Sequence, residues 1–289
     1  MTSDADGGPT APRVVVDGDV VHRPAQFWTP TVHALLRHLR AAGLRVPEPL
    51  GLDAGRERLR FLPGDSGAAC WPHQVDDDGL RSAARLLRAV HEATRGWCPP
   101  PDARWAAPPR PGPHEVVCHG DPGPWNMVWR NGTAVALLDW DLAYPGSALE
   151  DVAYALRWFA PCRSDAEAVR WHGFPEPPDR RHRITVFAQA YGLGSTDGLV
   201  DAVLTRPRQT LEQARHLADL GVEPQRTWVA AGHLDDLRAE LQWTRDHRHL
   251  LEVRGTPDAG AGTQRSGPVS STPGESEQDA VLLPVALPR

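Results

Sequence analysis

The chain has 289 residues, 40% of them hydrophobic, so it is long enough to form a sizeable core in one large domain or in two lobes. Its 37 acidic residues outnumber 31 lysines and arginines, and a net charge of −6 argues against a nucleic-acid-binding protein, which usually has a basic excess. No apolar run approaches the roughly 18 residues of a membrane helix, so we expect a soluble, cytoplasmic protein without a membrane partner.

The first part of the chain predicts a β-hairpin after a disordered end. Residues 1–11 are polar and contain Gly and Pro, so we expect them to be disordered. In the stretch 13–23, Asp17-Gly18 stands between two β-branched runs. Because both central positions of a tight hairpin turn need positive φ, Asp-Gly between apolar runs indicates two short antiparallel strands.

Two amphipathic helices with a strand between them follow. The apolar residues of 29–43 recur at i, i+3, i+4 and i+7, which predicts a helix, and Thr29 is its expected N-cap. A strand is expected at 58–64. A second helix is expected at 80–94. The acidic residues 76–78 precede it, where negative charge interacts favourably with the positive N-terminal end of the helix dipole.

The middle of the chain carries a loop that cannot be regular helix. The letters HGDPGPWN, at 119–126, contain two prolines and follow a short apolar stretch at 115–119, which predicts a strand. A second hairpin is expected at 127–140, with Asn131-Gly132 as its turn. The loop therefore lies between a strand and a hairpin.

The remainder of the chain shows a helical pattern. Ser147-x-x-Glu150 has the form of a capping box at the start of the first of these helices. Residues 254–289 are rich in Gly, Ser, Thr and Pro over most of their length, and we expect a disordered tail. Four helices are expected, at 147–159, 179–192, 197–220 and 225–251.

Three polar residues of the middle region are expected to converge. Asn126 leads directly into the hairpin, and the far strand of the hairpin runs past its start, which brings Asp139 near Asn126. Asn and Asp oxygens with phosphates and waters make the coordination shell that Mg²⁺ prefers. Asp121, in the same loop, is then left to accept a proton from an attacking hydroxyl.

The letters HGDPGPWN followed by LLDWDLAYPGSALEDVAYAL resemble the aminoglycoside phosphotransferase and choline kinase family, whose pattern is H-G-D-x4-N and then I-D-[WF]. The resemblance implies an α+β, protein-kinase-like, two-lobed fold. The expected lobes are a truncated nucleotide-binding β lobe at 12–66 and a mainly helical C-terminal lobe at 67–253, which carries the catalytic and substrate residues.

By this resemblance Asp121 takes the place of the catalytic base, and Asn126 and Asp139 take the places of the magnesium ligands. The implied cofactors are Mg²⁺ and ATP or GTP. The implied partners are the nucleotide and a small-molecule hydroxyl acceptor, such as an aminoglycoside or another amino alcohol. Three further residues have supporting places: His119, which would brace the loop, and the acidic Asp141 and Asp151.

The front of the chain departs from the family pattern. Only one hairpin precedes the helix at 29–43, so we expect a lobe of about three strands and one helix, without a Gly-rich loop over the phosphates. Arg23 ends the second strand where the family has Lys, and it is the expected phosphate-binding residue. The helix contains no Asp or Glu, so the ion pair that normally fixes the strand cation has no expected partner.

Two other functions remain open on the sequence. A non-catalytic protein that binds a small molecule or peptide, or that confers immunity to a toxin, would explain the shortened front lobe. A metal-dependent hydrolase would use His119, Asp121 and Asp139, but the chain lacks the His-rich ligand set that such enzymes need. The complete set of Asp121, Asn126 and Asp139 favours the phosphotransferase.

Overall fold

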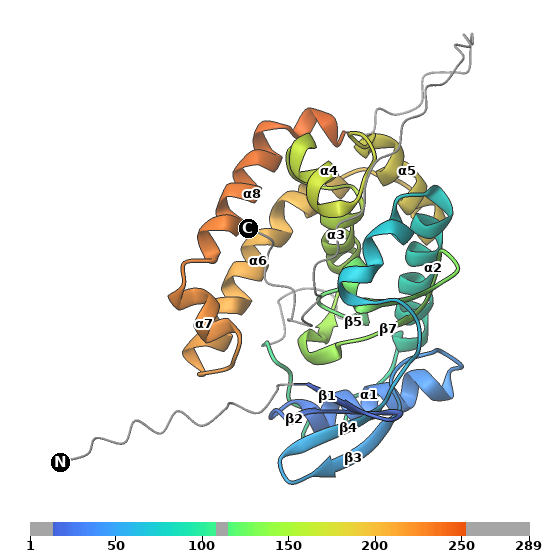
Figure 1. The fold of residues 1–289 in the computed structure, drawn as a ribbon, viewed down its shortest axis with the longest axis vertical. Coiled ribbons are helices and arrows are strands. Elements are labelled where there is room, and N and C mark those ends of the chain that lie inside the picture. Colours follow the sequence, from blue (N-terminus) through green and yellow to red (C-terminus); the bar gives the residue numbers. More distant parts are fainter. Residues whose placement is uncertain (1–13, 108–114, 253–289) are drawn as a thin grey trace, which may run out of the picture.

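The computed structural model describes residues 14–107 and 115–252 (Figure 1). The ends predicted to be disordered, 1–11 and 254–289, lie outside the described residues. The described chain forms a small sheet with one helix and, above them in the view of Figure 1, a larger and mainly helical part. This is the two-part arrangement that the sequence predicts.

The smaller part is a four-stranded antiparallel sheet with the strand order β1-β2-β4-β3. Helix α1 (Thr29–Ala41) lies next to it and connects its two hairpins (Figure 1). The strands are β1 (Val15–Asp17), β2 (Val20–Pro24), β3 (Pro49–Asp53) and β4 (Arg56–Arg60). The first hairpin is present as the Asp-Gly signal predicts, but its turn is shifted by one residue. Asp17 pairs with Val20, so the turn residues are Gly18 and Asp19, and of the two only Gly18 has a positive φ, at 57°.

The number of strands differs from the prediction of about three. The strand expected at 58–64 is the second strand of a hairpin, and the sequence did not reveal its first strand, β3. Pro49 and Gly51 are poor strand formers, and the pairing of β3 with β4 is irregular between these two residues. The alternating pattern that marks a strand is therefore weak in β3.

Helix α1 begins differently from the prediction, because Trp28 is its N-cap and contributes no side-chain cap. The Thr29 hydroxyl instead accepts a hydrogen bond from the backbone N–H of Gln26, at 2.8 Å. Gly43, at φ 86°, follows the end of the helix as expected. The apolar stripe of α1 is buried, as its spacing predicts: Val32, Leu35, Leu36 and Leu39.

The larger part begins with a 3₁₀ helix and the long helix α2. It also contains two small sheets of two strands each. Hairpin β6–β7 and helix α5 both pack against α2. The elements up to Gly146 are η1 (Gly67–Gln74), α2 (Asp77–Thr94), β5 (Val116–Cys118), η2 (Pro124–Asn126), β6 (Met127–Arg130), β7 (Thr133–Leu137), η3 (Trp140–Leu142) and β8 (Tyr144–Gly146).

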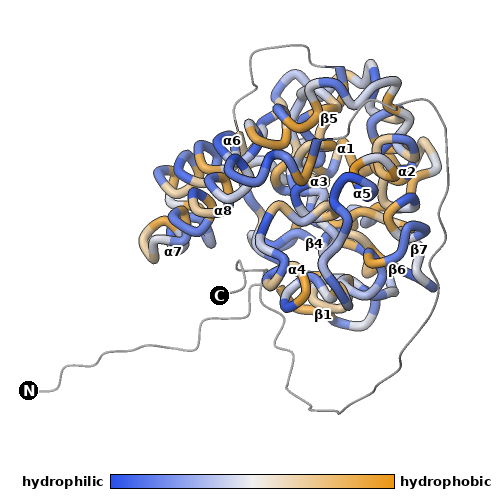
Figure 2. The backbone as a smooth tube through the Cα atoms, turned by 90° about the horizontal axis from the view of Figure 1, so that it is seen from above, coloured by the Kyte–Doolittle hydropathy of each residue, from blue (hydrophilic) through white to orange (hydrophobic). Residues whose placement is uncertain are grey.

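The helices that follow form two groups. Figure 2 shows α6, α7 and α8 extending to one side of the molecule, whereas α1, α2, α3 and α5 lie together in the main body. Their bounds are α3 (Ala148–Phe159), α4 (Asp165–His172), α5 (Arg180–Tyr191), α6 (Leu199–Asp219), α7 (Gln225–Ala230), α8 (Leu234–Asp246) and η4 (Arg248–Leu250). Among the described residues, no helix has both the length and the apolar character that a membrane span requires.

Three helix predictions need correction. The helix predicted at 225–251 is broken into α7, α8 and η4, because Gly232 takes φ 80° between the first two. Helix α4 was not predicted, although Ser164 and Glu167 form a complete capping box at its start. Ser147 caps α3, but the Glu150 carboxylate accepts a hydrogen bond from the Tyr144 hydroxyl at 2.7 Å rather than completing a capping box.

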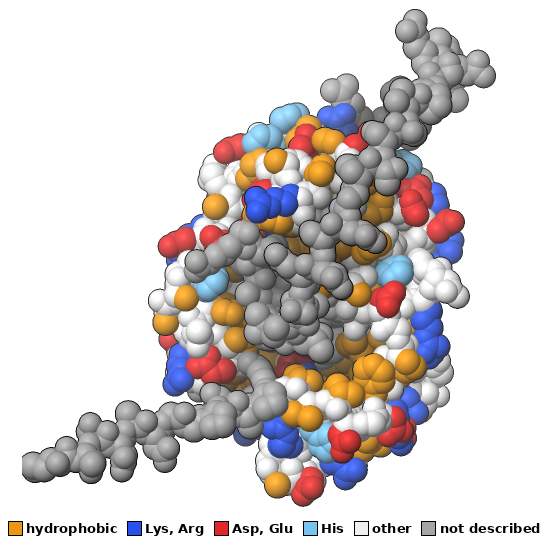
Figure 3. All heavy atoms as spheres, in the orientation of Figure 1, with side chains coloured by type: hydrophobic (Ala, Val, Ile, Leu, Met, Phe, Trp, Pro, Cys, Tyr) orange, Lys and Arg blue, Asp and Glu red, His pale blue; other side chains and the backbone are white. Residues whose placement is uncertain are grey.

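Charged side chains are interspersed over the face shown in Figure 3, where the described basic and acidic residues form no single continuous patch of one sign. The four cysteines are free thiols: Cys70, Cys98, Cys118 and Cys162.

A buried histidine makes the stability of the fold depend on pH. His172 of α4 is 1% exposed and lies between Trp71, to which its ring is tilted, and Trp158, on which it stacks. Burial, followed by the nearby Arg163, lowers the pKa of His172 to about 3 from its usual 6.5. The neutral ring is therefore stable in the fold, and stability is lost as the pH falls below the unfolded-state pKa.

We expect wild-type protein to lose about 1–2 kcal/mol more unfolding free energy between pH 7 and pH 5 than a His172→Phe variant. Phenylalanine keeps an aromatic ring between the two indoles but cannot take up a proton. Urea unfolding at the two pH values measures the difference. Identical pH profiles for the two proteins would contradict the assignment to His172.

Candidate active site

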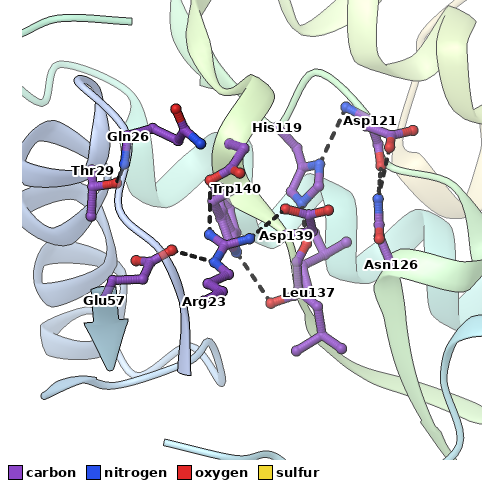
Figure 4. A network of polar contacts seen from close by, with 12 residues as sticks. Arg23, Gln26, Thr29, Glu57, His119, Asp121, Asn126, Leu137, Asp139 and Trp140 are labelled. Carbon is purple, nitrogen blue, oxygen red and sulfur yellow. Dashed lines mark hydrogen bonds and ion pairs between the residues drawn. The ribbon is translucent and has the colours of Figure 1, made fainter. Parts of the chain in front are cut away.

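The 119–126 loop and the hairpin after it meet as the sequence predicts. Strand β5 leads into the loop, and the backbone N–H of Leu138 donates to the Asn126 carbonyl at 2.7 Å. This hydrogen bond extends the β6–β7 ladder past Met127 and Leu137, so Asp139 follows directly after a residue paired with Asn126. Figure 4 shows the Asp139 side chain between the Arg23 guanidinium and the 119–126 loop.

Asp151 of α3 holds the backbone at the start of the loop. It is fully buried, and its carboxylate accepts hydrogen bonds from the backbone N–H groups of His119 (2.5 Å) and Gly120 (2.9 Å) and from the His91 ring (3.1 Å). Burial raises the pKa of Asp151, but these donors outweigh it and hold the pKa below its usual value. Asp151 is thus an ionised support of the loop.

His119 braces the loop from inside the protein. Its side chain is fully buried, and its Nε2 lies 2.7 Å from the Leu138 carbonyl, to which it donates. Its Nδ1 accepts the backbone N–H of Asp121 at 3.3 Å, and its ring packs edge-on against Trp140. Burial lowers the pKa of His119, so the ring is neutral and joins the loop to the hairpin.

Asp121 has the environment of a general base. Its Oδ2 accepts a hydrogen bond from the Asn126 Nδ2 at 2.9 Å, whereas its Oδ1 is buried and accepts no hydrogen bond of normal geometry from the residues that the structure describes. Burial raises the pKa of Asp121 to about 7. The neighbouring Tyr154 hydroxyl opposes this shift, and the charge of Asp139 adds to it. A carboxylate with a pKa near neutrality is suited to accept a proton at physiological pH.

Gly120 allows the loop to approach the hairpin closely. Its φ is 86°, and a Cβ at this position would lie 2.1 Å from the Leu142 carbonyl oxygen. The Gly120 carbonyl also accepts a hydrogen bond from the buried Arg206 at 2.8 Å. Only glycine combines this conformation with this contact.

Gly120→Ala is expected to lower the unfolding free energy by about 1–3 kcal/mol more than Gly18→Ala does. Both sites have positive φ and share the conformational cost of about 1–2 kcal/mol, but a Cβ at Gly18 would meet no atom of the described residues within 4 Å. Urea unfolding of the two variants isolates the contact with Leu142. Equal losses would show that the loop can shift away at no cost.

Arg23 connects the small sheet with the hairpin through three carboxylates. It lies directly opposite Glu57 in the antiparallel register of β2 and β4, and its Nε donates to Glu57. One terminal nitrogen donates to Asp139 at 2.8 Å (Figure 4). The other donates to Asp141, also at 2.8 Å. We call Arg23, Glu57, Asp139 and Asp141 the Arg23 cluster.

The expectation that Arg23 has no ion-pair partner was wrong. The partner comes from strand β4 and not from helix α1, because Glu57 is 1% exposed and faces the same side of the sheet as Arg23. Helix α1 contributes His33 instead, whose Nε2 lies 2.9 Å from the second oxygen of Glu57.

The Arg23 cluster carries an excess of negative charge. Burial would lower the pKa of Arg23, but Asp141, Asp139 and Glu57 together raise it above its usual value, so the guanidinium remains charged. Burial raises the pKa of Asp141 to about 6. Arg23 opposes this shift, and the charges of Asp139 and Glu57 add to it. One guanidinium thus does not fully offset three carboxylates.

The residues at Asp139 fit a magnesium ion by their chemistry. The Asn126 amide group faces Asp121, which leaves its carbonyl oxygen as a ligand, and Asp139 supplies a carboxylate. The mutual repulsion of the carboxylates would be relieved by a divalent cation. In the part of the chain that the structure describes, no group of three or more His, Cys, Asp or Glu forms a ready metal cage. Few protein ligands, completed by phosphates and waters, are typical of Mg²⁺.

Sequence reasoning missed several residues of the site. Glu57 was detectable, because the alternation in RERLR places it on one face of a predicted strand. Tyr154 lies near Asp121 and comes from α3, within the stretch 137–156 that carries the family resemblance, but it was not singled out. Arg206, which donates to the Gly120 carbonyl, comes from α6, where no motif marks it. His91 is a buried core residue, whose ring contacts the Asp151 carboxylate and the Tyr191 hydroxyl.

The sequence matches known proteins over most of its length. The family model described as "Phosphotransferase enzyme family" matches residues 29–107 and 101–184. A protein described as a trifolitoxin immunity protein, from Rhizobium leguminosarum bv. trifolii, is 31% identical over 252 residues, which cover 82% of this chain and 92% of that protein.

The structure is similar to solved structures at low sequence identity. A putative aminoglycoside phosphotransferase from Ralstonia eutropha JMP134 has a TM-score of 0.50 and 13% identity, over 78% of this chain and 86% of that chain. A choline/ethanolamine kinase family protein from Mesorhizobium loti has a TM-score of 0.49 and 16% identity, over 82% and 87% of the two chains.

The fold is therefore that of a protein-kinase-like α+β protein with a reduced front lobe, as the sequence predicted. The chain belongs to the phosphotransferase enzyme family.

Proposed function

We propose that this protein transfers the γ-phosphoryl group of ATP or GTP to a hydroxyl group of a small molecule. The observation that carries the proposal is the state of Asp121. Its Oδ2 is oriented by Asn126, burial disfavours its charged form, and its pKa is about 7. An acceptor hydroxyl that donates to the Asp121 carboxylate would be oriented for attack.

The other residues of the site have separate roles in this proposal. Asn126 and Asp139 hold Mg²⁺, which would neutralise the charge of the transferred phosphoryl group when bound. Arg23 binds phosphate oxygens with its planar fork of donors. Two residues keep the loop in place without touching the reacting atoms. His119 donates a hydrogen bond to the Leu138 carbonyl, and Asp151 accepts hydrogen bonds from the backbone N–H groups of His119 and Gly120. Asp141 sets the position of Arg23.

The two parts of the chain divide the binding tasks. The lobe at 12–66 contributes Arg23 and Glu57 and would bind the nucleotide phosphates. The lobe at 67–253 contributes the loop, the metal ligands and the acceptor-binding surface. Relatives with solved structures are described as aminoglycoside phosphotransferases and choline/ethanolamine kinases, which supports a small amino alcohol or aminoglycoside-like acceptor.

A second candidate is a non-catalytic immunity protein on the same fold. It is favoured by the 31% identical relative, which is described as an immunity protein and is matched over 92% of its length. The sheet of four described strands, whose first turn is tight and holds a single Gly, points the same way, because fewer backbone N–H groups are available to bind phosphates.

A thermal-shift screen with ATP and GTP, each with and without Mg²⁺, tests the proposal, followed by mass spectrometry for an added phosphate on a panel of alcohols. We expect Mg²⁺-dependent stabilisation by at least one nucleotide and a mass increase of one phosphate on at least one alcohol. Absence of both in wild-type protein would favour the immunity protein.

A further inference from the structure

We propose that the Arg23 guanidinium is a built-in competitor of the divalent cation, so that a cation reaches Asp139 only when Arg23 leaves it. The inference deepens the proposed function and rests on it, because Asp139 is the proposed metal ligand. It explains why Asp139 would bind a metal ion weakly until a nucleotide is bound. The inference is based on the contacts within the Arg23 cluster.

The geometry of Arg23 uses three separate donors on three separate carboxylates. Nε donates to Glu57, one terminal nitrogen donates to Asp139 and the other donates to Asp141. Glu57 belongs to the sheet, whereas Asp139 and Asp141 follow hairpin β6–β7, so the guanidinium joins the two lobes (Figure 4). A cation placed on Asp139 would face the positive charge of Arg23 at close range.

The ion pair between Arg23 and Glu57 is stronger than the ion pair between Arg23 and Asp139. The Glu57 side chain is 1% exposed and is also contacted by His33. Its ion pair with Arg23 therefore lies in a region of low dielectric. The Asp139 side chain is 51% exposed, and ion pairs of exposed groups contribute little stability. A cation therefore replaces the Arg23 guanidinium at Asp139, while Arg23 stays paired with Glu57.

Nucleotide phosphates change this competition. They offer Arg23 another pair of oxygen acceptors, which suit its fork of donors as well as a carboxylate does. Once Arg23 turns toward them, its ion pair with Asp139 is broken. Cation and nucleotide therefore bind cooperatively, and each raises the affinity for the other by the same factor.

The test measures Mn²⁺, a paramagnetic substitute for Mg²⁺, binding to full-length protein by electron paramagnetic resonance, with and without ATP. In the absence of ATP, Arg23→Gln is expected to bind Mn²⁺ at least about ten times more tightly than wild type, since the neutral amide removes the competing charge. The control is Arg60→Gln, on the same strand as Glu57. Arg60 pairs with Asp19 and Glu48 outside the Arg23 cluster, and its loss should leave the affinity unchanged.

ATP provides the second readout. It should raise the Mn²⁺ affinity of wild type by about tenfold or more and that of Arg23→Gln by much less. Arg23→Lys tests the same point if the glutamine variant does not fold, because one ammonium cannot contact three carboxylates, and its Mn²⁺ affinity should lie above that of wild type. Equal or weaker Mn²⁺ binding by the folded Arg23 variants, or no binding by any of them, would overturn the inference.

The proposed function fails by a different result. If the Arg23 variants gain Mn²⁺ affinity but wild-type protein transfers no phosphate to any alcohol, the competition stands and the phosphotransferase does not.

Discussion

Asp121→Asn is expected to reduce turnover by about 10²–10⁴-fold, which is the usual contribution of a positioned general base. Asparagine has nearly the same shape and can still accept the hydrogen bond from Asn126, but it cannot take a proton from the acceptor hydroxyl. The fold should be unaffected, because the raised pKa of Asp121 shows that its charged form is already disfavoured by burial. Steady-state kinetics with the alcohol found by mass spectrometry measure the loss.

Asp139→Asn is the matched comparison. This variant should weaken the affinity for Mg-nucleotide, because Asp139 is the proposed metal ligand, whereas Asp121→Asn should leave that affinity within about twofold. Nucleotide titration by calorimetry separates the two. An Asp121→Asn enzyme that retains wild-type turnover would rule out Asp121 as the base.

Asp151→Asn is expected to lower the free energy of unfolding by about 3–5 kcal/mol, the range for breaking a buried charged network by removal of one partner. The new amide group would face the backbone N–H groups of His119 and Gly120, and the His91 ring would lose its carboxylate. Buried donors without acceptors carry their full desolvation cost. Urea unfolding followed by circular dichroism measures the change.

Asp201→Asn is the control for this variant. Asp201 is 65% exposed and pairs with Arg248 at the surface, so its loss should cost less than about 1 kcal/mol. A loss of similar size for the two variants would mean that Asp151 is not the main support of the 119–126 loop. Hydrogen exchange at the amides of His119 and Gly120 gives an independent measure, which should accelerate in Asp151→Asn alone.

Much of the fold was predictable from local patterns. The turn at Gly18, the apolar stripe of α1 and the hairpin after Asn126 all follow from spacing and turn residues, and each is present. The misses have local causes. Strand β3 contains residues that disfavour strands, and the break at Gly232 lies inside a stretch that otherwise reads as continuous helix.

The sequence by itself determined which chemistry is present: a His-Gly-Asp loop, an Asn five residues after the Asp, and a hairpin whose length returns Asp139 to the loop. These features are local, because a two-residue turn and a proline-rich loop leave the backbone few alternatives. Only the tertiary structure decided which charges meet. Glu57 reaches Arg23 through strand pairing, and Asp139 reaches it across the two lobes, at sequence separations of 34 and 116 residues. Contacts at such separations depend on how whole elements pack, which no local pattern encodes.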